Sequence, residues 1–201
     1  EGVKPIIGIE AYVTPETARQ DQTRVSWDTN WNPDIDPQHR RRNPNDVSGG
    51  GLITHLTMWA ETDEGLVNLM KASTDANLEG RVMRYPRMDK EILAKYSKGI
   101  IASSGCPSGI IQTRLLLGQF DEALRAAGEL QDIFGRDNFY IEFMDHGLKI
   151  EKQVTDGLLD IAKKLNAPLL ATNDSHYVRA EDAGSQDAML CINSGSTLDE
   201  P

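Results

Sequence analysis

The sequence is poor in cysteine, in long apolar runs and in basic side chains. Its 201 residues include only two cysteines, Cys106 and Cys191, too few for a disulfide framework, so we expect a protein of the reducing cytoplasm. No stretch approaches the roughly 20 apolar residues that a membrane-spanning helix needs, so we expect no membrane partner. With 31 acidic against 21 basic side chains the net charge is −10, which argues against tight DNA binding by this chain alone.

The composition is that of a folded domain. Hydrophobic residues make up 39% and charged residues 26% of the chain, which is typical of globular proteins rather than disordered ones. The chain begins Glu1-Gly2-Val3 without a methionine and soon enters an apolar run. We therefore expect a piece cut from a longer protein.

Apolar runs of strand length recur along the chain, and amphipathic patterns separate most of them. The apolar runs are 5–13, 52–58, 99–102, 138–143 and 168–172, and helices are predicted around 66–73, 88–96, 120–134, 158–165 and 186–192. The first, third and fifth runs are apolar on both faces, as strands of a covered parallel sheet are. This alternation predicts an α/β fold, either a doubly wound sheet or a (β/α) barrel.

Residues 14–51 break the alternation. They are rich in Asp, Asn, Arg and Pro, and they contain the runs 40–42 of arginine and 49–51 of glycine. A long segment without periodicity is usually functional or disordered, so we predict a mobile insertion. Its tryptophans, Trp27 and Trp31, are expected in a solvated loop rather than docked on the domain.

Residues capable of binding metal accompany every apolar run. They are Glu10, His55, Cys106, the Asp145-His146 pair, and Asp174 with His176. Because the carboxyl ends of parallel strands meet on one face of a sheet, we expect these side chains to converge there. Carboxylate, imidazole and thiolate together suit a divalent cation. In an extended segment, Asp174 and His176 would also point the same way.

Each of these residues also has an ordinary explanation. Glu10 and Asp174 are candidates for helix caps, His55 for a neutral core histidine, Cys106 for a small buried hydrophobe, and residues 145–147 for a turn. A cysteine nucleophile at Cys106 with a histidine base is a further alternative, but no thiol-protease signature accompanies it. Taken one at a time the ordinary explanations are favoured. Taken together they are not, since a ligand type recurs at each run.

Five short motifs carry a resemblance to a known family. They are PIIGIEAYV at 5–13, THLT at 54–57, SGC at 104–106, MDHG at 144–147 and ATNDSHY at 171–177. In this order they resemble the PHP (polymerase and histidinol phosphatase) domain, in the form found at the amino terminus of bacterial, actinobacterial-type, replicative DNA polymerase III alpha subunits. Residues 1–190 would be a partial PHP domain, and 191–201 would begin the linker toward the polymerase core.

The resemblance implies a (β/α)7 barrel whose amino-terminal strands are missing here, with a metal cluster at its carboxyl rim. That cluster has nine ligands around up to three ions, zinc or manganese. Five ligand positions are matched, by Glu10, His55, Cys106, Asp174 and His176, and His146 is expected beside the pocket without certain contact to metal. The other four ligands would precede this chain. We therefore expect partial metal occupancy and little nuclease activity from these residues alone.

The function implied is that of a replicative polymerase subunit. Its PHP site would be a metal-dependent phosphoesterase or 3′→5′ exonuclease, while a core outside this chain synthesises DNA and contacts DNA, the sliding clamp and other holoenzyme subunits. Two alternatives remain open. One is a stand-alone PHP phosphoesterase similar to histidinol phosphatase, and the other is a PHP scaffold without catalytic activity.

Overall fold

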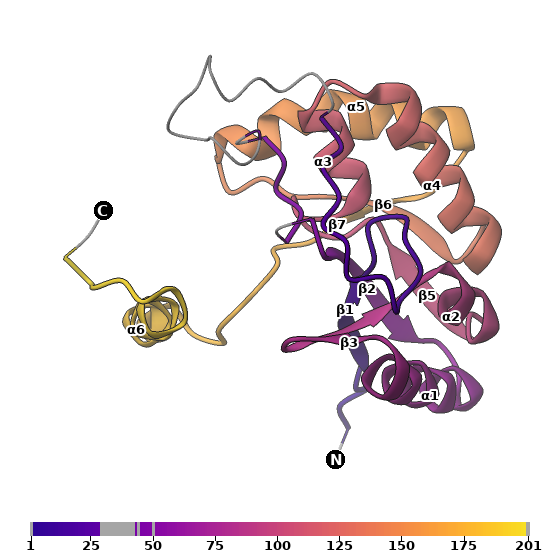
Figure 1. Ribbon diagram of the computed structural model, residues 1–201, viewed down its shortest axis with the longest axis horizontal. Coiled ribbons are helices and arrows are strands. Elements are labelled where there is room, and N and C mark those ends of the chain that lie inside the picture. Colours follow the sequence, from indigo (N-terminus) through magenta and orange to yellow (C-terminus); the bar gives the residue numbers. More distant parts are fainter. Residues whose placement is uncertain (1, 29–42, 44, 50, 200–201) are drawn as a thin grey trace.

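The computed structural model describes residues 2–28, 43, 45–49 and 51–199 (Figure 1). In this part of the chain a mixed sheet has the order β3-β4-β1-β2-β5-β6-β7. The strands are β1 (Gly8–Val13), β2 (Thr54–Ala60), β3 (Arg81–Val82), β4 (Tyr85–Met88), β5 (Ile100–Ser103), β6 (Phe139–Phe143) and β7 (Leu169–Ala171). The helices are α1 (Asp63–Glu79), α2 (Lys90–Lys95), α3 (Ile110–Leu116), α4 (Phe120–Phe134), α5 (Lys149–Leu165) and α6 (Ala183–Ser194), with a short 3-10 turn η2 (Ala180–Asp182).

One central strand runs against its neighbours. β2 pairs antiparallel with both β1 and β5, whereas β5, β6 and β7 are mutually parallel. β1, β5 and β7 run in one direction, as predicted for the first, third and fifth apolar runs. The covered parallel sheet expected for them is wrong, because antiparallel β2 separates β1 from β5 and because β1 and β7 carry exposed residues. The expectation that His55 reaches the rim as part of a parallel strand is wrong, because β2 brings it there at its amino end. The α/β class is confirmed, and the described strands form an open order with β3 and β7 at its edges.

The core lies between one face of the sheet and the helices. Leu56 and Met58 of β2 and Phe139 and Ile141 of β6 are at most 2% exposed and belong to one apolar cluster with α1, α4 and α5. Burying such side chains stabilises the fold by roughly 1.5 to 3 kcal/mol each. Because strand side chains alternate, the opposite face carries the residues between them. That second face holds the polar residues described below.

The predicted helices are confirmed, with corrections to their bounds. α5, for example, begins at Lys149, nine residues before its predicted start. α4 occupies the predicted 120–134 and ends at Gly135, whose φ of 93° only glycine adopts easily. The helix expected from residue 88 begins at Lys90, because the Asp89 carboxylate accepts the Ile92 N–H as an N-cap. Met88 belongs instead to β4, and the β3–β4 hairpin and α3 have no counterpart in the predicted pattern.

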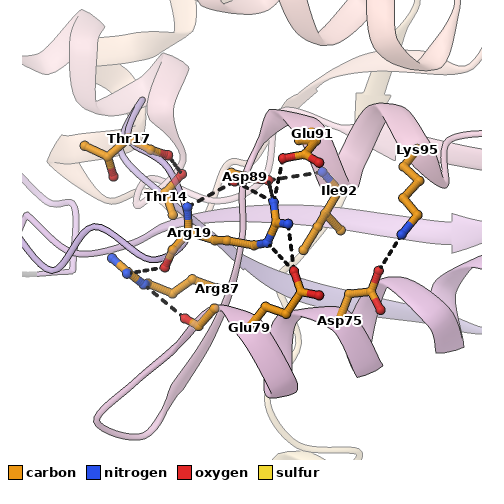
Figure 2. A network of polar contacts seen from close by, with 11 residues as sticks. Thr14, Thr17, Arg19, Asp75, Glu79, Arg87, Asp89, Glu91, Ile92 and Lys95 are labelled. Atoms are coloured by element: carbon orange, nitrogen blue, oxygen red, sulfur yellow. Dashed lines mark hydrogen bonds and ion pairs between the residues drawn. The ribbon is translucent and has the colours of Figure 1, made fainter.

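The described part of the 14–51 segment is packed against the domain. Fully buried Arg87 donates to the carbonyl oxygens of Leu52 (3.3 Å) and Asp21 (2.8 Å) as well as to those of Gly80 and Arg19. The Arg19 side chain in turn contacts three carboxylates, those of Glu79, Asp89 and Glu91 (Figure 2). Through Arg87, β4 therefore holds both the start of the segment, at Arg19 and Asp21, and Leu52 directly after its end.

Trp27 corrects the expectation of a solvated loop. It is 7% exposed, and the Arg114 guanidinium lies 4.5 Å from its ring centroid. Trp31, the arginine run 40–42 and Gly50 lie outside the described residues.

The last helix stands apart from the sheet. Figure 1 shows α6 at the end of an extended segment, and none of its residues is buried. Arg84 of the β3–β4 turn donates to the Asn193 side-chain oxygen at 3.0 Å. Among the helices of the described ranges, none has the length and apolar character needed to cross a membrane.

Candidate metal centre

Three of the five predicted ligands meet on the second face of the sheet. Glu10, His55 and Cys106 each offer one donor atom, and these atoms lie within 4.8 Å of one another. His55 Nδ1 is 2.6 Å from Glu10 Oε1 and 3.4 Å from Cys106 Sγ, and the sulfur is 3.8 Å from the same carboxylate oxygen. The three donors thus face a common point.

Strand register brings Glu10 and His55 together. In the antiparallel β1–β2 pair, Glu10 lies opposite Thr57 and Tyr12 lies opposite His55. Side chains opposite one another share a face, and diagonal neighbours two residues apart are within reach of long side chains. Glu10 and His55 form such a diagonal pair. Tyr12 packs beside the imidazole with ring centroids 5.6 Å apart.

A turn after β5 folds Cys106 over β2. The His55 N–H donates to the Ser108 carbonyl at 3.1 Å, and the Gly109 N–H closes the turn on the Cys106 carbonyl at 2.8 Å. Gly105 has a φ of +78°, and a Cβ on Gly109 would lie 2.4 Å from the Ser104 carbonyl oxygen. Both positions therefore favour glycine, one for its backbone conformation and the other for close approach.

The cluster is strongly coupled electrostatically. Burial by itself lowers the pKa of His55, but hydrogen bonds with Cys106 and Glu10 raise that pKa to about 10. The same hydrogen bond from His55 lowers the pKa of Glu10, which partial burial alone would raise. His55 is therefore not the isolated neutral core histidine of the ordinary explanation.

Asp174 and His176 lie on the loop after β7 and are not part of this group. Both are exposed, and they line a cleft of about 650 Å³ together with His146 and Tyr177. His176 Nδ1 is 2.6 Å from the Asp174 carbonyl oxygen, and Asp174 has a φ of +44°. The segment is therefore a turn and not the extended pair that alternate spacing suggested. The charge of His176 contributes to the lowered pKa of Glu10.

The sequence analysis made no prediction for two buried carboxylates, Glu151 in the wall of the cleft and Glu142 on β6. Glu142, 4% exposed, accepts hydrogen bonds from the Ser103 and Thr172 hydroxyls. Glu151, 5% exposed, accepts one from His146. The signal for Glu142 was a lone acid inside an apolar strand, because such a group is buried only when hydrogen-bonded. Glu151 gave no such signal, since an acid in the first turn of a helix is common.

The donor set fits a divalent cation. Imidazole nitrogen, thiolate sulfur and carboxylate oxygen are the ligands that zinc binds in proteins, usually four at a time. Glu10, His55 and Cys106 supply three, so one ion would need at least one more donor. Asp174 and His176, on the loop after β7, are the remaining predicted ligands.

Comparison with known proteins identifies the family of this chain. A family model for the PHP domain matches residues 1–146. DNA polymerase III subunit alpha of Mycobacterium tuberculosis is 50% identical over 200 residues, covering 100% of this chain and 16% of that protein. The Saccharopolyspora erythraea protein of that name is 51% identical over 199 residues, which is 99% of this chain and 16% of the relative.

A more distant relative shows the same extent. DNA polymerase III subunit alpha of Thermus aquaticus is 38% identical over 200 residues, or 100% of this chain and 14% of that protein. The chain thus spans about one-sixth of the length of the curated relatives it matches. The resemblance drawn from the five sequence motifs is confirmed, and the chain belongs to the PHP domain family.

Proposed function

We propose that this chain is the PHP portion of a bacterial replicative DNA polymerase alpha subunit and holds a divalent-metal site for phosphoester hydrolysis. The ligands would be Glu10, His55 and Cys106, joined by Asp174 and His176 from the cleft. The observation that carries the proposal is the set of three donor atoms within 4.8 Å of one another. The 50% identity to polymerase subunits supports the wider assignment.

Each residue has a definite task in this proposal. Glu10, His55 and Cys106 would bind the cation, each through one donor atom. A bound divalent cation supplies Lewis acidity, which activates water and offsets the charge of a phosphate ester. The cleft beside Asp174 and His176 gives room for a nucleotide, since ligand pockets span roughly 300 to 1,000 Å³. The substrate would be the 3′ end of a DNA strand, cut in the 3′→5′ direction.

The remaining parts of the expectation belong to the whole subunit. There, the sheet described here would close into the (β/α)7 barrel with further strands, and the site would hold up to three zinc or manganese ions. DNA synthesis, and contact with DNA, the sliding clamp and other holoenzyme subunits, would reside in the polymerase regions that the relatives' length implies. Residues 191–201 would lead toward them.

Two alternatives are less well supported. A stand-alone phosphoesterase similar to histidinol phosphatase is disfavoured, because the relatives at 48–51% identity are named as polymerase subunits. A scaffold without chemistry is disfavoured because Glu10, His55 and Cys106 are metal-competent side chains aimed at one point.

Metal analysis combined with primer digestion tests the proposal. This chain and the full-length subunit are purified without chelator, assayed for zinc and manganese, and incubated with 3′-labelled primer and Mn²⁺. We expect metal in both, and digestion by the full-length subunit that Asp174→Asn abolishes. No digestion by the wild-type full-length subunit would support the scaffold instead. Unchanged metal content and digestion in Asp174→Asn would remove Asp174 from the site.

A further inference from the structure

His146 joins two elements that border the cleft. Its Nδ1 lies 2.6 Å from Oε1 of Glu151 in α5, and its Nε2 lies 3.0 Å from the carbonyl oxygen of Asn173 in the loop after β7. An ionised carboxylate and a backbone carbonyl only accept hydrogen bonds. Both ring nitrogens must therefore carry a proton for both bonds to form, so His146 is an imidazolium.

Glu151 is held as the matching anion. Its second oxygen, Oε2, accepts the backbone N–H groups of His146 at 2.8 Å and Leu148 at 3.2 Å. Burial alone would raise the pKa of Glu151, but these bonds and the one from the imidazole lower it. The bond to Glu151, aided by the charge of Asp174, raises the pKa of His146. Two charged groups therefore face the imidazole, the Glu151 carboxylate from α5 and the Asp174 carboxylate from the loop after β7.

The loop that His146 contacts needs support. Asp174 has a φ of +44°, a region that non-glycine residues rarely adopt and that costs of order 1 kcal/mol or more. β7 is only three residues long, and Leu169 and Ala171 are exposed, so the strand alone anchors the loop weakly. Thr172, two residues before Asp174, is held separately, because its hydroxyl donates a hydrogen bond to the buried Glu142 carboxylate. Thr172 and Asn173 are thus each tied to a buried acid.

We propose that His146 is a positioning residue, an imidazolium tie from Glu151 to Asn173 that holds the Asp174–His176 loop in place to complete the metal site. The loop geometry is independent of the metal, while the effect on metal binding rests on the proposed function. A polar tie of this kind behind metal ligands typically changes metal affinity by about 10- to 100-fold.

Glu151→Gln is the sharpest test, because glutamine keeps the length and the capping oxygen but removes the charge that holds the second ring proton. The matched control is Asp160→Asn, which removes the same charge from an exposed position of α5. In the metal-free chain, NMR follows the titration of His146 and hydrogen exchange of the 173–177 amides. We expect wild-type His146 to titrate above the ordinary histidine range. Glu151→Gln should lower that midpoint and speed exchange of these amides about tenfold, with no change in Asp160→Asn.

A zinc titration gives the second readout. We expect Glu151→Gln to bind zinc about tenfold more weakly than wild type and Asp160→Asn to bind it equally. An ordinary titration midpoint for wild-type His146, or unchanged amide exchange in Glu151→Gln, would refute the link from Glu151 through His146 to Asn173. Equal zinc affinity in wild type and Glu151→Gln would overturn its role in metal positioning. Absence of zinc binding by wild type would refute both the proposed function and the metal-positioning role. The NMR result would still show whether His146 links Glu151 to Asn173.

Should Glu151→Gln fail to fold by circular dichroism, His146→Gln replaces it. The His146 side chain is 38% exposed, and its loss leaves the Glu151 cap of α5 intact. Faster exchange of the 173–177 amides in His146→Gln supports the tie, and unchanged exchange overturns it.

Discussion

The two halves of the candidate site differ in how the fold supports them. Glu10, His55 and Cys106 stand on the central strands β1 and β2 and on a glycine-bounded turn, next to the core. Asp174 and His176 stand on an exposed loop after a three-residue edge strand. The first half, the strand cluster, is set by sheet register. The second, the loop arm, is set by a few polar bonds.

This difference implies a division of labour. Central-strand side chains have little freedom, because moving them disrupts backbone pairing and packing on the other face. Loop residues adjust at low cost and are drawn from the less stable parts of a fold. We therefore expect changes in the strand cluster to alter both stability and metal binding, and changes in the loop arm to alter metal binding alone.

The largest loss of stability is expected from Gly109→Ala, which changes the turn that carries Cys106. The new Cβ would lie 2.4 Å from the Ser104 carbonyl oxygen, so the turn that carries Cys106 must shift. We predict a loss of about 2 to 3 kcal/mol in unfolding free energy, measured by urea denaturation, together with weaker zinc binding. Gly128→Ala in α4 is the control, because its Cβ meets only Leu165 at 3.9 Å. An equal loss in both variants would contradict the special role of the turn.

Cys106→Ser removes one donor while keeping the turn. Serine is nearly isosteric but is a much poorer zinc ligand than a thiolate. We predict that zinc affinity falls by about 100-fold or more, since even indirect partners of a ligand account for 10- to 100-fold. Cys191→Ser in α6 is the matched control and should bind zinc as wild type does. Equal zinc affinity in Cys106→Ser would remove the cysteine from the strand cluster.

Glu16→Gln tests a carboxylate that lies outside both halves and ties the chain after β1 to α3 and α4. Burial alone would raise the pKa of Glu16, but hydrogen bonds from Arg125 and Arg114 lower it, so folding favours the ionised form. Its contribution is therefore present above the ordinary pKa of 4.5 and is lost as pH falls through the lower folded value. We predict that Glu16→Gln costs about 1 to 2 kcal/mol at pH 7.

Urea denaturation between pH 7 and pH 3 checks this prediction. The stability difference between wild type and Glu16→Gln should shrink as the pH falls. A difference that stays constant would show that the carboxylate charge does not stabilise this side of the domain.

Asp174→Asn is expected to have the smallest effect on stability. The side chain is exposed, so unfolding free energy should change by no more than about 0.5 kcal/mol. Zinc affinity should still fall about tenfold if the loop arm completes the site. Calorimetric titration beside urea denaturation measures both. A loss of stability as large as that of Gly109→Ala would erase the distinction between the two halves.

The sequence predicted the elements better than their arrangement. Strand and helix positions followed from periodicity, and α4 matched its predicted bounds because an amphipathic stripe is a local signal. The direction of β2 did not follow, since an apolar run reads the same in either direction. The β3–β4 hairpin could not be predicted, because proline and arginine at 86 and 87 are unusual in a strand. The burial of Arg87 depends on carbonyl oxygens far away in the sequence, which the sequence alone does not identify.

The candidate site was likewise predictable in part. The residue types of Glu10, His55 and Cys106 pointed to a metal, and their approach agrees with that hypothesis. Their role as ligands stays a prediction, as do those of Asp174 and His176. The supporting acids Glu142 and Glu151 were not predicted, because their partners lie on other strands or across a turn whose geometry a linear sequence does not display.

Cobalt substitution tests the central claim most directly. If Cys106 and His55 bind one cation, adding Co²⁺ to the metal-free chain produces a thiolate-to-cobalt charge-transfer absorption band. Cys106→Ser should lose this band, and Cys191→Ser should keep it. No band in the wild-type chain, or an undiminished band in Cys106→Ser, would contradict a metal centre built on Glu10, His55 and Cys106.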